Sequence, residues 1–348
     1  MDLPGGGTVT LDGARAVTEG WCNTLAVNPR ILRCTADDGR TVVVKMRRAP
    51  GDPRRRDGFR RELMSLLLLA ELGCDAGPRL LATDDSAGLL VLEDLGSGPA
   101  LEDVLVGDDP DAATAAFVAL AEAVARMHVA TLGQAGEIGP PWFDVRDHWR
   151  RIGAFTDTTG ADADLAGVLE VLDSGPMALS NGDVAPQNCR LAGGRMRLLD
   201  FEDAACRHPL LDAAHFRLPF YGAPCWARIP TGVGMRVEAA YRRVTGRADD
   251  RAYAEGMAAA VAAWTVIRFV RLPKLLDADP PHPLGFSRRG QLLDTLRVGA
   301  DATAGHFPGL AAWFDDAGRR LRERWPGLPP AQDVYPAYRK VASLPLCR

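Results

Sequence analysis

A short polar island at residues 178–202 constrains this chain more than any other segment, because it interrupts a long series of expected helices. Its first apolar run leads into Asp183, and Asn188 follows five positions later. Its second apolar run ends at Asp200. If the two runs are the strands of one hairpin, these three oxygen-bearing side chains converge at one end of it. The island therefore predicts a polar site between two buried strands.

The types of residue in the island indicate a chemistry. Mg²⁺ takes oxygen ligands, usually one or two carboxylates completed by phosphates and water. Phosphoryl transfer also needs a separate carboxylate that orients the acceptor hydroxyl and receives its proton. A surface hairpin with acidic turn residues is the alternative, and either aspartate alone would favour it. The joint pattern of Asp-x-x-x-x-Asn and a strand-terminal Asp-Phe-acidic sequence favours magnesium-dependent phosphoryl transfer.

The chain before the island is expected to form strands and one helix. Apolar and β-branched runs bounded by turn residues predict strands at 14–27 (around a turn at Glu19-Gly20), 31–35, 41–46, 79–83 and 88–92. Residues 59–72 contain no Gly or Pro and are followed by Gly73, which predicts a helix with its usual C-terminal glycine. This segment is therefore expected to be a small antiparallel sheet with one helix.

The sequence Gly-Ser-Gly-Pro at 96–99 is a break in composition and a predicted hinge. Beyond it, helices are expected at 112–131, 165–172, 235–245, 253–276 (with a break near Pro273) and 291–306. The expected fold class is α+β in two lobes. Residues 1–95 would form the N-terminal nucleotide-binding lobe, and residues 96–348 a larger, mainly helical lobe with the catalytic loop and the acceptor site.

Composition excludes several classes of protein. The 348 residues include 41 Lys and Arg against 45 Asp and Glu, so the basic excess of a dedicated nucleic-acid binder is absent. The longest nearly uncharged apolar run, 256–267, is shorter than the ~20 residues that span a bilayer. The 7 cysteines are scattered and contain no Cys-x-x-Cys pair. We expect a reduced cytoplasmic protein, monomer or homodimer, with no nucleic-acid or membrane partner.

The motifs of the island resemble those of the aminoglycoside phosphotransferase family of protein-kinase-like enzymes. The family signature is His-Gly-Asp-x-x-x-x-Asn, then Ile/Leu-Asp-Phe/Trp-Glu/Asp. The matching segments here are Asn181-Gly182-Asp183-x-x-x-x-Asn188 and Leu199-Asp200-Phe201-Glu202. The resemblance implies that Asp183 is the catalytic base, that Asn188 and Asp200 are Mg²⁺ ligands, and that Asp212 is a structural acid. Asn181 replaces the family histidine, which puts the geometry of the loop in question.

The segment before the island offers an independent check. Kinases that bind phosphates use a lysine on a strand, held by a glutamate on a helix. Lys45 follows the apolar run 41–44, and Glu62 lies 17 residues further on, in the expected helix. Taken alone, Lys45 could be a solubilising lysine at the edge of a sheet, and Glu62 could lie on the solvated face of the helix. Their order and spacing ahead of Asp183 favour a pair that holds the α- and β-phosphates of a nucleotide.

Two weaker matches concern the nucleotide. The segment Gly20 to Thr24, with Asn23, resembles the family's nucleotide-positioning loop, although a purely structural turn is equally compatible with it. Glu93 and Leu95 match the inter-lobe hinge, whose backbone groups would contact the purine edge. Because backbone atoms make these contacts, both ATP and GTP stay open as phosphoryl donors.

The acceptor is expected to be a hydroxyl group of a small molecule. Residues 205–300 contain 14 Lys and Arg against 8 Asp and Glu, whereas a site for polycationic aminoglycosides should be acidic. A non-aminoglycoside antibiotic, such as a nucleoside or a macrolide, fits better. The alternatives are a pseudokinase that only binds nucleotide or ligand, a metabolic kinase for choline, homoserine or a sugar, and a protein kinase, which lacks its usual motifs here. His128, at the end of an Ala-rich helix, is interpreted as a packing residue.

Overall fold

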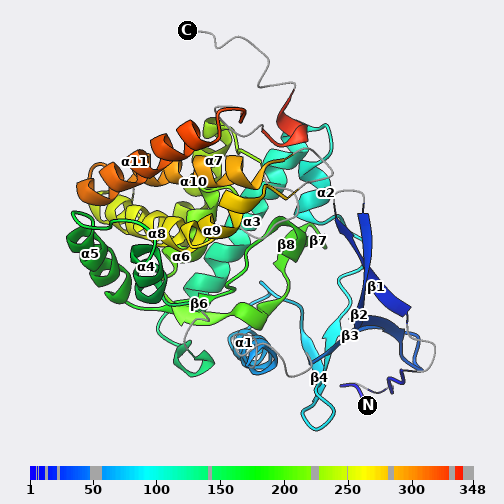
Figure 1. Ribbon diagram of the computed structural model, residues 1–348. Coiled ribbons are helices and arrows are strands. Elements are labelled where there is room, and N and C mark those ends of the chain that lie inside the picture. The colour runs from blue at the N-terminus through cyan, green and yellow to red at the C-terminus, as the bar shows by residue number, and fades with distance from the viewer. Residues whose placement is uncertain are drawn as a thin grey trace.

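The computed structural model describes residues 1–4, 6, 8–11, 15–21, 24–47, 57–139, 143–220, 227–248, 250–280, 286–328 and 334–339. Figure 1 shows a twisted sheet on one side and a larger helical body on the other, with helix α1 (Gly58–Glu71) beside the sheet. The expected combination of an N-terminal antiparallel sheet with one helix and a mainly helical C-terminal lobe is confirmed.

The N-terminal sheet has five strands in the order β1-β2-β3-β5-β4, and every neighbouring pair is antiparallel. The strands are β1 (Arg15–Trp21), β2 (Thr24–Thr35), β3 (Thr41–Met46), β4 (Leu80–Asp84) and β5 (Leu89–Glu93). The turn expected at Glu19-Gly20 is wrong, because the ladder continues past it and pairs Gly20 with Leu25 and Trp21 with Thr24. Residues 22–23, between the two strands, lie outside the described residues.

Alternation along β3 decides which side chains face the helical lobe. Val42 and Val44 are 1% exposed and pack in a small apolar cluster on one face of the sheet. Val43 points to the opposite face and packs against the main core. Because successive side chains of a strand point to opposite faces, Lys45 shares the face of Val43. The strand thus carries its one lysine toward α1 and the helical lobe.

The helical lobe contains more helices than the sequence predicted. Its helices are α2 (Leu101–Leu105), α3 (Pro110–Thr131), α4 (Val145–Gly153), α5 (Asp162–Asp173), α6 (Leu210–Ala213), α7 (Thr231–Thr245), α8 (Arg251–Phe269), α9 (Leu272–Asp277), α10 (Arg288–Thr303) and α11 (Pro308–Arg324). Helices α2, α4, α6 and α11 were not expected. The break predicted near Pro273 is confirmed, since Pro273 lies in the first turn of α9, where its missing N–H costs nothing.

The polar island forms two ladders rather than one hairpin. Strands β7 (Cys189–Ala192) and β8 (Arg195–Leu198) pair through a turn in which Gly193 and Gly194 have positive φ. Strand β6 (Ala178–Ser180) pairs instead with β9 (Ala205–Arg207), which the sequence reading missed. The expectation that the strand before Asp183 pairs with the strand before Asp200 is therefore wrong. Because the two-glycine turn pairs β8 with β7, β6 pairs with β9, the next strand along the chain.

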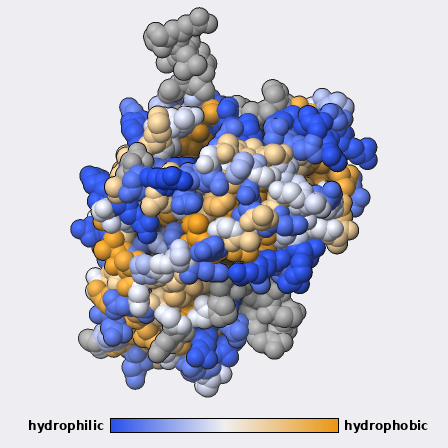
Figure 2. All heavy atoms as spheres, turned by 90° about the vertical axis from the view of Figure 1, so that its left-hand side faces the viewer, coloured by the Kyte–Doolittle hydropathy of each residue, from blue (hydrophilic) through white to orange (hydrophobic). Residues whose placement is uncertain are grey.

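Helix α3 lies at the centre of the helical lobe. Within the part of the chain that the structure describes, it is the one helix long and apolar enough to cross a membrane, but 61% of that segment is buried inside the protein. It packs along α7 and also contacts β6 and β8. Its apolar surface is thus used in the core. On the face shown in Figure 2, apolar residues are interspersed with charged ones.

Candidate active site

A lysine and two carboxylates from three separate elements meet between the lobes. Lys45 Nζ on β3 lies 2.6 Å from Glu62 Oε2 on α1 and 2.5 Å from Asp200 Oδ1, which follows β8. Lys45 and Glu62 are 8% and 3% exposed. Glu62 belongs to the buried stripe of α1, whose other members recur at helical spacing. The pairing predicted between Lys45 and Glu62 is present, and Asp200 joins it from the helical lobe.

The electrostatics of this cluster keep the lysine charged. Burial by itself lowers the pKa of Lys45, but the negative charges of Asp200 and Glu62 raise it by more, so its pKa lies above the ordinary lysine value. A charged ammonium group at this point can contact the phosphates of a nucleotide. The two carboxylates balance its charge in a buried place where a lone ammonium would be costly.

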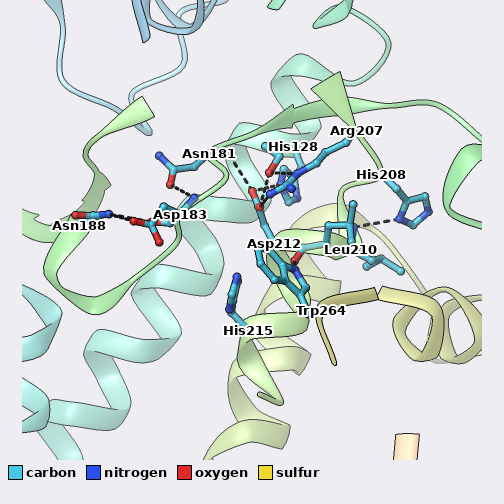
Figure 3. A network of polar contacts seen from close by, with 12 residues as sticks. His128, Asn181, Asp183, Asn188, Arg207, His208, Leu210, Asp212, His215 and Trp264 are labelled. Atoms are coloured by element: carbon cyan, nitrogen blue, oxygen red, sulfur yellow. Dashed lines mark hydrogen bonds and ion pairs between the residues drawn. The ribbon is translucent and has the colours of Figure 1, made fainter. Parts of the chain in front are cut away.

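Asp183 lies in a loop that follows β6 and is held from two sides. Asn188 Nδ2 donates to Asp183 O at 3.1 Å and to Asp183 Oδ2 at 3.0 Å, so the amide orients the carboxylate (Figure 3). Gly182 has a φ of +85°, and a Cβ there would lie 2.0 Å from Asp203 O. Glycine is therefore required immediately before Asp183. The predicted base and the predicted metal ligand Asn188 are brought together.

Asn181 connects this loop to the segment that carries Asp200. Its Nδ2 lies 3.1 Å from Leu199 O and 3.4 Å from Asp200 O, and its Oδ1 accepts a hydrogen bond from Asp183 N at 3.2 Å. Asp200 has a φ of +58°, the one positive φ outside glycine among the described residues. Strained backbone of this kind persists only where its surroundings hold it. Asn181 thus supplies a hydrogen-bonded brace where the family has histidine.

A buried ion pair lies beneath the loop (Figure 3). Asp212 on α6 accepts hydrogen bonds from Asn181 N (3.1 Å), from Arg207 Nη2 (3.1 Å) and from the hydroxyl of Ser180. His128 Nε2 lies 3.3 Å from Asp212 Oδ2, the oxygen that also accepts from Asn181 N, whereas Ser180 and Arg207 bond to Oδ1. Burial would raise the pKa of Asp212, but the bond from His128 and the charge of Arg207 hold it far below the usual range. Asp212 is therefore an ionised acceptor that anchors the start of the loop.

The donor set fits a magnesium ion bound together with nucleotide phosphates. No group of three or more His, Cys, Asp or Glu side chains suited to a metal occurs among the described residues. A Mg²⁺ ion in a phosphotransferase needs fewer protein ligands, because phosphates and water complete its shell. Asn188 uses its amide nitrogen on Asp183, which leaves the amide oxygen for a cation. The Asp200 side chain is 34% exposed, so a ligand can reach it from solvent.

The residues predicted to contact the nucleotide base are only partly described. Gly20 belongs to strand β1 and Thr24 to strand β2, where the two strands meet. Asn23 lies outside the described residues. Glu93 ends β5, and its N–H already donates to Arg79 O at 2.9 Å. Glu93 Oε2 also accepts from Arg197 at 3.2 Å, which links the hinge to β8. Leu95 lies two residues further on, in the linker between the lobes.

A cavity of about 730 Å³ lies in the helical lobe, between α7, α10 and residues 216–219. Its charged lining consists of Arg217, Arg228, Arg242, Arg297, Glu238, Asp294 and Asp301. Arg217 and Glu238 form a two-point ion pair at 2.8 and 2.6 Å. The wall, as far as the structure describes it, includes none of Asp183, Asn188 and Asp200.

Sequence reasoning missed most of the buried support of the loop. Asp212 was expected as a structural acid, but Ser180 and Arg207 were not considered. His128 was interpreted as packing, and that interpretation is incomplete, because both of its ring nitrogens make polar contacts. The signal that could have found them is a set of polar residues inside apolar runs, since buried polar groups are almost always hydrogen-bonded.

Comparison with known proteins agrees with this geometry. Residues 26–258, more than half of the chain, match the phosphotransferase enzyme family, APH. The chain belongs to this family. No curated protein matches the chain at a significant level of sequence similarity.

Solved structures share the fold of this phosphotransferase family member at low sequence identity. A choline/ethanolamine kinase family protein from Mesorhizobium loti is 14% identical and has a TM-score of 0.53, over 86% of this chain and 92% of the other. Amicoumacin kinase hAmiN, solved with AMP-PNP, Ca²⁺ and Ami, is 16% identical and has a TM-score of 0.50, over 94% of this chain and 92% of the other. Both likenesses confirm the kinase-like fold.

Proposed function

We propose that this protein transfers the γ-phosphoryl group of ATP or GTP, bound with Mg²⁺, to a hydroxyl of a small molecule in the cytoplasm. The observation that carries the proposal is the meeting of Lys45, Glu62 and Asp200 between the lobes, with Lys45 Nζ within 2.6 Å of both carboxylates. These residues are up to 155 positions apart in sequence. Their convergence serves phosphate and metal binding directly.

Each residue has a separate task in this proposal. Lys45 contacts the α- and β-phosphates, and Glu62 fixes the position of its ammonium group. Asn188 and Asp200 would hold Mg²⁺, which neutralises charge on the phosphates when bound. Asp183 orients the acceptor hydroxyl and takes its proton, with its carboxylate held by Asn188. Gly20, Asn23, Thr24, Glu93 and Leu95 are proposed to contact the nucleotide.

The brace at Asn181 favours an active enzyme over a pseudokinase. Its side chain bonds to Leu199, Asp200 and Asp183, so the loop is held without the family histidine. The amide makes these contacts by hydrogen bonding alone and takes no part in proton transfer. Replacement of the histidine therefore leaves the proposed chemistry intact.

The nucleotide site is tested by thermal unfolding with Mg·ATP and Mg·GTP. At a hundredfold excess over Kd, binding adds about 2.7 kcal/mol of stability and raises Tm by several degrees. The Asp200→Asn variant should lose the metal-dependent shift, and asparagine tolerates the positive φ at this position. Asp173→Asn, at an exposed acid of α5, is the matched control and should keep the shift. No shift with either nucleotide in the unmodified protein would contradict the proposal.

The acceptor is proposed to be neutral or anionic, of the nucleoside or macrolide antibiotic type. The excess of basic residues in 205–300 supports this; the cavity of the helical lobe is lined by four arginines and three acids and so adds little support. A metabolic kinase for choline, homoserine or a sugar would use the same residues. Transfer of labelled γ-phosphate to a panel of these compounds separates them. Phosphorylation of aminoglycosides alone would overturn the acceptor class while leaving the chemistry in place.

A further inference from the structure

A chain of hydrogen bonds links helix α7 to the buried side of the catalytic loop. Tyr241 of α7 is fully buried, and its hydroxyl oxygen lies 2.9 Å from His128 Nδ1. His128 Nε2 lies 3.3 Å from Asp212 Oδ2, and the same oxygen accepts the N–H of Asn181 at 3.1 Å. Figure 3 shows His128, Asp212 and Asn181 side by side, with Asp183 just beyond. The chain thus ends two residues before the proposed base.

The charges around Asp212 set the direction of each bond. Asp212 is ionised, so its carboxylate only accepts hydrogen bonds, and His128 Nε2 must donate. Arg207, 5% exposed, balances the charge of Asp212 in this buried place. The second ring nitrogen of His128, Nδ1, has the Tyr241 hydroxyl as its partner. Burial raises the pKa of Tyr241, so this hydroxyl keeps its proton.

Packing fixes the ring of Tyr241 independently of this hydroxyl. Helix α7 packs along α3, which carries His128. The Tyr241 ring lies edge-on to Phe216, with centroids 5.8 Å apart, and edge-on to His128 at 5.7 Å. A phenylalanine at this position would therefore keep the shape of the core and remove only the hydrogen-bond donor.

We propose that Tyr241 is a positioning residue of the phosphotransferase. Its hydroxyl bonds to Nδ1 of His128 and so holds the ring with Nε2 toward Asp212. His128 then holds Asp212, and Asp212 holds the backbone of Asn181 and so the placement of Asp183. This inference rests on the function proposed for Asp183. It adds Tyr241, which belongs to none of the sequence motifs described above, to the residues that support the site.

The test compares Tyr241→Phe with Tyr253→Phe. Tyr253 is a buried tyrosine on α8 that takes no part in the series of hydrogen bonds from Tyr241 to Asn181. Ring ¹⁵N chemical shifts of labelled histidines report the hydrogen bonding of each ring nitrogen, and His128→Gln identifies the His128 signals. Tyr241→Phe should displace the Nδ1 signal of His128. It should also lower kcat for Mg·ATP or Mg·GTP turnover, with water as acceptor, about fivefold at unchanged KM. Tyr253→Phe should change neither.

Each other result decides against one of the two proposals. Unchanged His128 shifts in Tyr241→Phe, or changed shifts with unchanged kcat, overturn the positioning role. If the unmodified protein turns over no nucleotide with water as acceptor, kcat gives no comparison, and the proposed function is judged separately by its own nucleotide-binding test. The backbone amide signal of Asn181 then decides: its displacement in Tyr241→Phe supports the link from α7 to the loop, and a stationary signal overturns it.

Discussion

At the scale of single residues, the side chains of the site hold one another in fixed orientations. Asn188 uses its amide nitrogen on Asp183, and Asn181 uses both ends of its amide on the loop and on the Asp200 segment. Each amide can do this because it carries a donor and an acceptor. The carboxylate of Asp183 is thereby presented in one orientation before any substrate arrives, which is the condition for efficient proton transfer.

Asp183→Asn should lower nucleotide turnover by about 10²–10⁴, because an amide cannot take the proton of the acceptor hydroxyl. Nucleotide affinity should stay nearly unchanged, since Lys45, Asn188 and Asp200 are intact. Turnover and the thermal shift with Mg·nucleotide are measured on the same preparation. Turnover equal to that of the unmodified protein would remove Asp183 from the role of base.

At the scale of elements, the linker after β5 is attached to β7 rather than free. Leu191 N donates to Pro99 O at 3.0 Å, and Arg190 Nη1 donates to Gly98 O at 2.5 Å. A Cβ at Gly98 would lie 1.8 Å from Leu191 O, so this contact has no room for a side chain. The composition break predicted as a hinge is thus a tightly packed connection to the strand that follows the catalytic loop.

Gly98→Ala should lower the free energy of unfolding by about 1–3 kcal/mol, because the linker must move away from β7. Gly136→Ala is the matched control, since nothing lies within 4 Å of a Cβ at that position. Urea unfolding of both variants measures the difference. Equal stability of the two would show that the linker accommodates a methyl group without cost.

At the scale of the whole molecule, buried histidines couple stability to pH. Burial, reinforced by the charge of Arg268, lowers the pKa of His215 to about 3. Its ring packs against Phe220 and Trp264, with centroids 5.9 and 4.8 Å away. In the unfolded chain a histidine binds a proton near pH 6.5. Between these two values the unfolded state holds more protons, so stability falls as the pH falls.

The expected slope for His215 is about 1.4 kcal/mol per pH unit, or about 2 kcal/mol between pH 6.5 and 5. His215→Gln removes this contribution, whatever constant cost its altered packing adds at both pH values. Urea unfolding at pH 6.5 and pH 5 should show a smaller loss in His215→Gln than in the unmodified protein. Equal losses would mean that His215 takes up a proton without unfolding.

The sequence by itself predicted the residues of the proposed site and determined the order of the two lobes. Asp183, Asn188 and Asp200 follow apolar runs at short spacing, and Lys45 and Glu62 belong to a strand and a helix that local patterns specify. Such features depend on side-chain periodicity and turn residues, which neighbours in the chain control.

Only the tertiary structure decided how these pieces are held together. Three contacts show this: the pairing of β6 with β9, the brace at Asn181, and the buried contact between His128 and Tyr241. Each joins residues that lie 18 to 113 positions apart in the sequence. Nothing in the local sequence selects such partners, because a buried polar side chain bonds to whatever donor or acceptor the packing brings within reach. The residues that do the proposed chemistry were visible in the sequence, and those that position them were not.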